Sequence, residues 1–175
     1  NWLISGLASG ATLMLYDGSP VLKNNENILF DYADQEKFNI MGISAKFLDT
    51  CRKLELNPMN SHNLSSLRMM LSTGSVLNPD CFDYVYEKIK SSFCLSSISG
   101  GTDIVSCFVL GSNILPVYRG ELQTRGLGMS VEVWDELGSP VNGRKGELVC
   151  TETFPSKPVM FWDDKAMKKY SNSYF

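Results

Sequence analysis

Short apolar runs that suit β-strands alternate with segments that suit helices through the first half of the chain. This alternation restricts the fold most, because neighbouring parallel strands need a crossover connection, usually a helix, between them. The sequence therefore predicts an α/β fold with a mostly parallel sheet and helices on both faces. Strands are expected at residues 12–16, 38–43, 67–71 and 93–95, and helices at residues 2–9 and 44–54.

The best-marked helix is expected to begin at residue 78. Asn78 can cap the helix with its side chain, Pro79 suits the first turn, and Asp80 places an acid near the positive end of the helix dipole. The apolar side chains that follow share one face of the helix, which predicts that this face packs on the sheet. They are Phe82, Val85, Tyr86 and Ile89.

The pattern changes after residue 116, where strand-like runs follow one another without long helices between them. Residues 135–146 form a turn-rich excursion, which is typical of an antiparallel hairpin or a small barrel. We therefore predict an α/β subdomain at residues 1–116 and a β-rich subdomain at residues 117–175. Strands of the second subdomain are expected at residues 117–123, 130–134 and 147–151.

Composition excludes several classes of protein. A net charge of −3 over 175 residues, without a large basic patch, argues against a nucleic-acid-binding surface. The five scattered cysteines and the single His62 predict neither a zinc site nor a disulfide framework, so reduced thiols in a cytosolic protein are expected. The apolar opening at residues 2–16 is too short and too rich in Ser and Gly for a membrane span.

Hydroxyl, glycine and carboxylate groups are concentrated at residues 96–103, directly after the predicted strand at 93–95. Open α/β sheets bind ligands at the carboxyl ends of their strands, and these groups suit a phosphate and a metal ion. A second segment, residues 71–79, holds the end of another predicted strand and a glycine-containing turn that leads into a helix. Each segment alone also fits an ordinary turn, but two such turns beside one sheet favour a joint site.

Residues 99–103, Ser-Gly-Gly-Thr-Asp, resemble the Tyr-Gly-x-Thr-Glu motif of the adenylate-forming, or AMP-binding, acyl-CoA synthetase superfamily. Residues 127–135 and 145–150 resemble the Pro-Gly-x-x-x-x-Val-x-Asp and Gly-Glu-Leu strands of that superfamily. Residues 97–108 resemble the signature of one of its members, the acetoacetyl-CoA synthetase family. The resemblance spans essentially the whole chain, with further agreement at residues 10–20, 71–75 and 116–122.

The resemblance implies roles for individual residues. Thr102 would contact the α-phosphate and Asp103 would hold Mg²⁺, so these two are the candidate catalytic residues. Gly100 and Gly101 would line the acyl pocket, where acetate-specific members place a tryptophan at the position of Gly100. Glycine there leaves room for a longer acid. The nucleotide-binding residues would be Gly74, Ser75, Val76, Ser97, Ile98, Ser99, Gly101 and Thr102.

The activity implied by the resemblance is that of an acetoacetate–CoA ligase, which forms acetoacetyl-adenylate from ATP with Mg²⁺ and then transfers the acyl group to coenzyme A. Its partners would be these small molecules, without nucleic acid, membrane or metal cluster. The chain would be an internal fragment, inactive alone because the family's phosphate loop and C-terminal lysine match nothing in it. It would also be prone to aggregation, because some of the cover that its parallel strands need comes from other segments in this family. The alternatives are another carboxylate–CoA ligase of the superfamily and a non-catalytic nucleotide-binding or interaction fragment. Arg119 and Arg125 are candidate anion contacts, but a solvated surface is the favoured interpretation of both.

Overall fold

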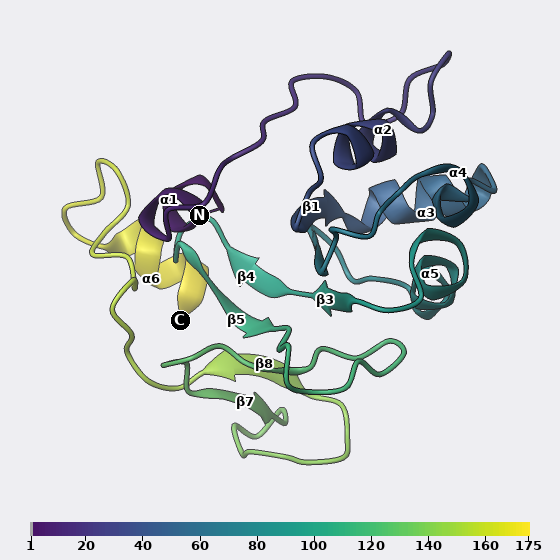
Figure 1. Ribbon diagram of the computed structural model, residues 1–175. Helices are drawn as coiled ribbons and strands as arrows, with labels where there is room; N and C mark the ends of the chain where they lie inside the picture. The colour runs from purple at the N-terminus through teal and green to yellow at the C-terminus, as the bar shows by residue number, and fades with distance from the viewer. Residues whose placement is uncertain (1) are drawn as a thin grey trace. The chain divides into compact units, whose positions relative to one another are not determined.

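In the computed structural model the chain forms two compact units (Figure 1). The structure describes residues 2–175, except for the side chain of Trp2. Trp2–Ser99 and Val109–Arg125 make up the parallel-sheet unit, and Gly100–Phe108 and Gly126–Phe175 make up the hairpin unit. These units are groupings in space, and the predicted subdomain boundary after residue 116 stays a prediction.

The parallel-sheet unit is built on three strands in the order β1-β2-β3. They are β1 (Ile40–Ser44), β2 (Met69–Thr73) and β3 (Cys94–Ser97), and both neighbouring pairs are parallel. Helices occupy the crossovers between them, as parallel pairing requires. The predicted α/β class with a mostly parallel sheet is therefore confirmed, and three of the predicted strands are found within three residues of their expected bounds.

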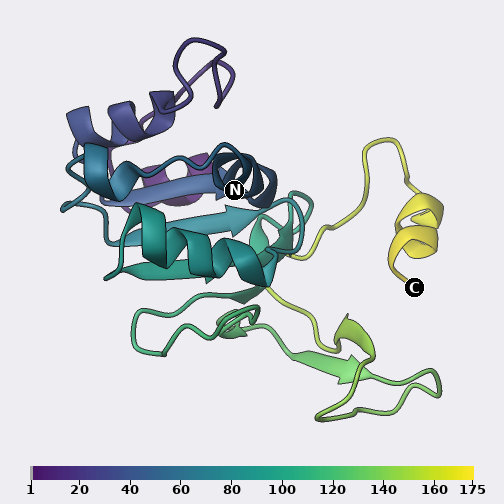
Figure 2. The same cartoon turned by 90° about the vertical axis from the view of Figure 1, so that its right-hand side faces the viewer.

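Two capped helices cover one face of this sheet (Figure 2). Helix α3 (Ala45–Lys53) begins after Ser44, whose hydroxyl accepts a hydrogen bond from the amide of Phe47 at 3.1 Å. Helix α5 (Pro79–Tyr84) begins after Asn78, as the sequence predicts, and continues as a π-helical turn, Val85–Ile89. Each large apolar side chain buried between the helices and the sheet stabilises the fold by about 1.5–3 kcal/mol. The buried side chains include Phe47, Leu48, Phe82, Val85, Ile89 and Met70.

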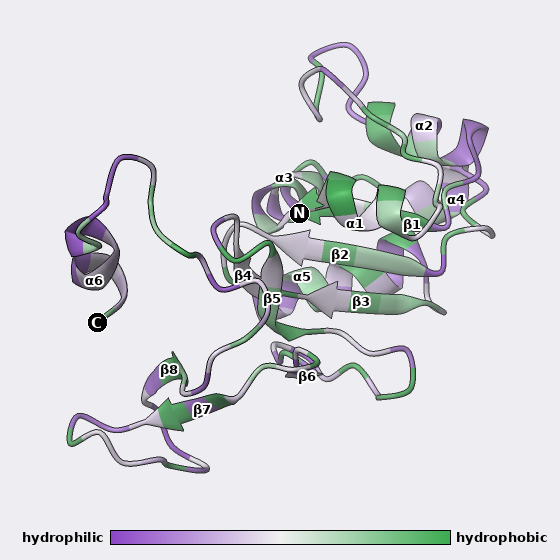
Figure 3. Ribbon diagram, turned by 90° about the vertical axis from the view of Figure 1, so that its left-hand side faces the viewer, coloured by the Kyte–Doolittle hydropathy of each residue, from purple (hydrophilic) through white to green (hydrophobic). Residues whose placement is uncertain are grey.

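The other face of the sheet is more open. Along β1, Met41 and Ile43 are buried, whereas Ile40 remains 48% exposed. Helix α1 (Trp2–Ala8) lies on this side of the sheet, and the Gly10 that follows it has a left-handed φ of 71° (Figure 3). The side chains of residues 3–8 in α1 are mostly exposed. None of the helices in the described part of the chain is long and apolar enough to cross a membrane.

A polar contact joins two helices that the sequence analysis did not predict, α2 (Ile28–Gln35) and α4 (Pro58–Ser61). Asp31 on α2 accepts a hydrogen bond from Asn25 Nδ2 at 2.8 Å and lies 2.9 Å from Nε2 of His62, which caps α4. These two contacts, with Asn25 the stronger, hold the pKa of Asp31 below its ordinary value.

The second sheet has the strand order β4-β5-β6, with β4 (Ser99–Gly101), β5 (Ser106–Leu110) and β6 (Thr124–Arg125). The strand predicted at residues 117–123 is wrong. The side-chain amide of Gln123 donates to the carbonyls of Ser112, Leu115 and Pro116, and this contact holds residues 111–123 as a loop.

The hairpin unit contains β7 (Val131–Trp134) and β8 (Glu147–Cys150), which pair in antiparallel fashion as the sequence predicts. Helix α6 (Lys168–Tyr174), which was not predicted, follows Met167, a residue with a left-handed φ of 53°. The start of α6 is held by Asp164, which is 6% exposed and whose Oδ2 accepts a hydrogen bond from the amide of Tyr170 at 2.9 Å.

The strand predicted at residues 12–16, buried on both faces, is also wrong. This run forms no strand, and Leu15 is 67% exposed. An apolar run becomes a strand only when another strand pairs with it, and none of residues 2–175 does so here.

Candidate nucleotide-binding site

Parts of both segments that the sequence analysis singled out lie at the carboxyl edge of the parallel sheet, residues 74–76 of one and residues 97–99 of the other. Strand β2 ends at Thr73 and β3 ends at Ser97, and Ser72 is the register partner of Ser97. The amide of Ile98 donates to the carbonyl of Ser72 at 2.9 Å, which extends the pairing beyond β3. The structure therefore brings residues 74–76 and residues 97–99 to the same edge of the sheet, where open α/β folds bind ligands.

Gly74 turns the chain away from β2. Its φ of 88° lies in the left-handed region, and a Cβ atom there would meet nothing within 4 Å, so backbone conformation is what requires glycine at this position. Val76 is 90% exposed beyond this turn and offers an apolar surface. The helix start that follows is capped internally, because Asn78 Oδ1 accepts the amide of Asp80 at 3.0 Å.

Residues 100–103 belong to the hairpin unit. Strand β4 ends at Gly101, and a turn closed by a 3.2 Å hydrogen bond from the amide of Val105 to the carbonyl of Thr102 leads to β5. Thr102 and Asp103 are both exposed on this turn. A hydroxyl and a carboxylate in adjacent positions can donate to a phosphate oxygen and hold a cation, respectively.

The two glycines of this segment differ in their surroundings. A Cβ atom at Gly100 would lie 2.4 Å from the carbonyl oxygen of Ser106 and 2.7 Å from Cα of Cys107, both backbone atoms of β5. A Cβ atom at Gly101 would meet nothing within 4 Å. Gly100 is thus required for the close approach of β4 to β5, whereas Gly101 faces open space.

Asp103 has a partner that the sequence did not reveal. The hydroxyl of Tyr174, on α6, donates a hydrogen bond to Asp103 Oδ2, and this bond raises the pKa of Tyr174. The two residues are 71 positions apart, so no local pattern could have predicted the contact.

The donor set at this turn fits Mg²⁺. No group of three or more His, Cys, Asp or Glu side chains in residues 2–175 could hold a metal ion by itself. Mg²⁺ in phosphoryl-transfer sites is held by one or two carboxylates together with substrate phosphates and water. The single exposed carboxylate of Asp103, an oxygen donor, agrees with that mode of binding.

Of the two candidate anion contacts, Arg119 is already engaged. Its Nη2 lies 2.9 Å from Asp80 Oδ1, and its Nε lies 2.8 Å from Asp83 Oδ2, so two carboxylates compensate its charge. Arg125, on β6, is exposed and pairs through its backbone with Val109.

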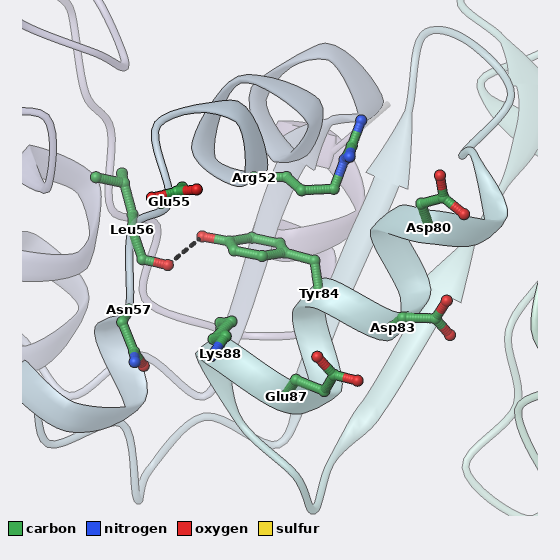
Figure 4. Close-up of a pocket in the computed structure, with 9 residues that line it drawn as sticks. All are labelled: Arg52, Glu55, Leu56, Asn57, Asp80, Asp83, Tyr84, Glu87 and Lys88. Atoms are coloured by element: carbon green, nitrogen blue, oxygen red, sulfur yellow. Dashed lines mark hydrogen bonds between the residues drawn. The ribbon is translucent and has the colours of Figure 1, made fainter.

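Each unit contains a cavity. The cavity of the parallel-sheet unit, about 520 Å³, is lined by charged side chains of both signs, the acids Glu55, Asp80, Asp83 and Glu87 and the bases Arg52 and Lys88 (Figure 4). No predicted site residue lines this cavity, so it is not part of the candidate nucleotide site. The cavity of the hairpin unit, about 620 Å³, is lined mainly by apolar and aromatic side chains and includes Tyr174.

Residues 1–156 match the family described as AMP-binding enzyme, and the chain therefore belongs to that family. Within it, the chain is similar to acetoacetyl-CoA synthetases. It is 59% identical to acetoacetyl-coenzyme A synthetase of Rhizobium meliloti and 49% identical to acetoacetyl-CoA synthetase of Mus musculus, in each case over the whole chain. The fold matches acetoacetyl-CoA synthetase from Streptomyces lividans with a TM-score of 0.89 and 38% identity over 99% of the chain.

The chain spans about a quarter of the length of these relatives. It covers 27% of the Rhizobium meliloti protein, 26% of the Mus musculus protein and 27% of the Streptomyces lividans chain. The resemblance to the acetoacetyl-CoA synthetase family is thus confirmed for this segment.

Proposed function

We propose that the protein containing this chain is an acetoacetate–CoA ligase, an ATP-dependent acid–thiol ligase of the cytosol whose partners are small-molecule substrates. The observation that carries this proposal is the identity of 59% over all 175 residues to a protein named acetoacetyl-coenzyme A synthetase. The position of residues 74–76 and 97–99 at the carboxyl edge of the parallel sheet supports a nucleotide site.

The nucleotide would be bound by both turns. Residues 74–76 would contact one side of the adenine and residues 97–99 the other, because the two segments start from neighbouring strands. The hydroxyl of Thr102 would donate to the α-phosphate, and Asp103 would hold Mg²⁺, which neutralises charge that develops on the phosphates. Gly100 and Gly101 would line the pocket that holds the acetoacetate.

The reaction would proceed in two displacements. A carboxylate oxygen of acetoacetate attacks the α-phosphorus of ATP, and the bond from that phosphorus to pyrophosphate breaks. The thiol sulfur of coenzyme A then attacks the acyl carbon, loses its proton, and releases AMP as the leaving group. The task of Thr102 in the first step is to stabilise the negative charge on the α-phosphate oxygens as the new bond forms.

Acetoacetate-dependent exchange of pyrophosphate into ATP, measured on the complete protein, tests the proposal. Thr102→Ala and Asp103→Ala should each slow exchange by the equivalent of roughly 2.7–4 kcal/mol of barrier, the usual effect of removing one charge-stabilising donor. Glu136→Ala, which removes an exposed acid from a turn of the same unit, is the control and should exchange at the parental rate.

The choice of acid needs a separate measurement. Thioester formation with acetate, propionate, butyrate and acetoacetate separates an acetoacetate–CoA ligase from another carboxylate–CoA ligase of the family. A preference for acetate or butyrate would replace the proposed substrate. Absence of exchange with every acid would favour a protein that binds nucleotide without catalysis.

A further inference from the structure

The carboxylate of Asp103 is held by one hydrogen bond, from the hydroxyl of Tyr174 to Oδ2. Asp103 is exposed on its turn, and an exposed aspartate otherwise rotates freely about its side-chain bonds. With Oδ2 occupied by the phenol, the direction of the second oxygen, Oδ1, is restricted as well. The hydrogen bond therefore orients the carboxylate as a whole.

Tyr174 is itself held in place by aromatic neighbours in the same unit. The centroid of its ring lies 5.9 Å from that of Phe161 and 5.2 Å from that of Tyr170. Phe161 and Tyr170 also contact each other edge to face, with their centroids 5.5 Å apart. Ring pairs at these distances restrict the motion of the phenol, so its hydroxyl is presented in a defined place.

The helix that carries Tyr174 is anchored at its start. The buried carboxylate of Asp164 accepts the amide of Tyr170, and Tyr170 is 5% exposed at the centre of the aromatic cluster. A continuous set of contacts thus runs from Asp164 through α6 and the ring of Tyr174 to the carboxylate of Asp103.

We propose that Tyr174 is a positioning residue for the metal-holding carboxylate of Asp103, an inference that rests on the proposed function. The phenol holds Oδ2, so Oδ1 is the oxygen that would be left to hold the cation that accompanies the nucleotide. Hydrogen bonds of this kind, made to a metal-ligating carboxylate by a residue that does not touch the metal, orient the ligand and commonly change metal affinity 10–100-fold. Tyr174 touches neither substrate nor metal in this role.

Tyr174→Phe in the complete protein tests the proposal, because it removes only the hydroxyl. Binding of Mn²⁺ in the presence of ATP, measured by electron paramagnetic resonance, should weaken roughly 10-fold. The Mg²⁺ concentration that half-saturates pyrophosphate exchange should rise by a similar factor, whereas the rate at saturating Mg²⁺ should change little. Tyr170→Phe is the matched control, because Tyr170 lies on the same helix and in the same cluster but does not bond Asp103; it should leave Mn²⁺ binding unchanged.

A double-mutant cycle separates positioning from a general structural effect. If Tyr174 acts through Asp103, Tyr174→Phe should have no further effect on Mn²⁺ binding in an Asp103→Asn background. Equal weakening in both backgrounds, or no weakening in the parent, would overturn the proposal. If Asp103→Asn weakens Mn²⁺ binding and Tyr174→Phe does not, only the positioning role fails. If Asp103→Asn itself leaves Mn²⁺ binding unchanged, the metal role in the proposed function fails instead.

Discussion

Replacing Gly100 by alanine should destabilise the protein through a backbone clash. The new Cβ atom would lie 2.4 Å from the carbonyl oxygen of Ser106 and 2.7 Å from Cα of Cys107. Non-bonded carbon contacts are normally about 3.5 Å or longer, so β4 and β5 must separate by about 1 Å. Both opposing atoms belong to the backbone, and no change of rotamer can relieve the contact. We therefore expect a loss of about 2–3 kcal/mol, in the upper part of the range for overpacking.

Gly101→Ala provides the matched control, because the same methyl group one residue later meets nothing within 4 Å. Urea unfolding of the two variants and the parent measures the difference. For a typical slope of about 2 kcal/mol per molar urea, Gly100→Ala should lower the midpoint by about 1–1.5 M, and Gly101→Ala should leave it nearly unchanged. Equal midpoints for both variants would show that the close approach of β4 to β5 does not require glycine.

Three further predictions concern the parallel-sheet unit. Lys90→Met should lower stability by about 2–3 kcal/mol in thermal or urea unfolding, because Nζ donates to three backbone carbonyls at 2.6–2.9 Å. Lys88→Met, which replaces an exposed lysine two residues earlier, should not. Ser72→Ala should raise stability by about 1 kcal/mol, because the Ser72 hydroxyl is fully buried without a partner in the described residues; a loss would contradict this. The pKa of Asp31 is lowered in the folded protein, so the ionised carboxylate stabilises the fold above about pH 4 and this contribution is lost as the pH falls. In parallel acid titrations, Asp31→Asn should therefore lose less stability than the parent between pH 5 and pH 3.

Features set by neighbouring residues could be predicted from the sequence. The start of α5 follows from Asn78 and Pro79, and the capping bond to Asp80 forms as expected. The β7–β8 hairpin and the parallel strands follow from apolar runs bounded by turns. In each case the side chain that decides the structure lies within a few residues of the element it forms.

Features that depend on distant partners were missed or wrongly predicted. Residues 12–16 have the composition of a buried strand, but no strand pairs with them in the described chain. Residues 117–123 were expected as a strand. Instead, the side-chain amide of Gln123 donates hydrogen bonds to backbone carbonyls of the loop, and these residues do not pair with another strand among the described residues. The contact between Asp103 and Tyr174 joins positions 71 residues apart, and only the folded chain reveals it.

Glycine at residues 100 and 101 can be required for two different reasons, room for a bound acid or a close approach of two strands, and the sequence alone does not distinguish them. The family resemblance explains Gly100 by the room it leaves for a longer acid. The structure adds a second reason, because the backbone of β5 excludes any Cβ atom at this position. A change of acid preference caused by a bulky residue at Gly100 would therefore include displacement of β5. At Gly101 no such contact exists, so a small side chain placed there would not have to move a strand. Gly101 is therefore the position at which the proposed acyl pocket can be tested separately from packing.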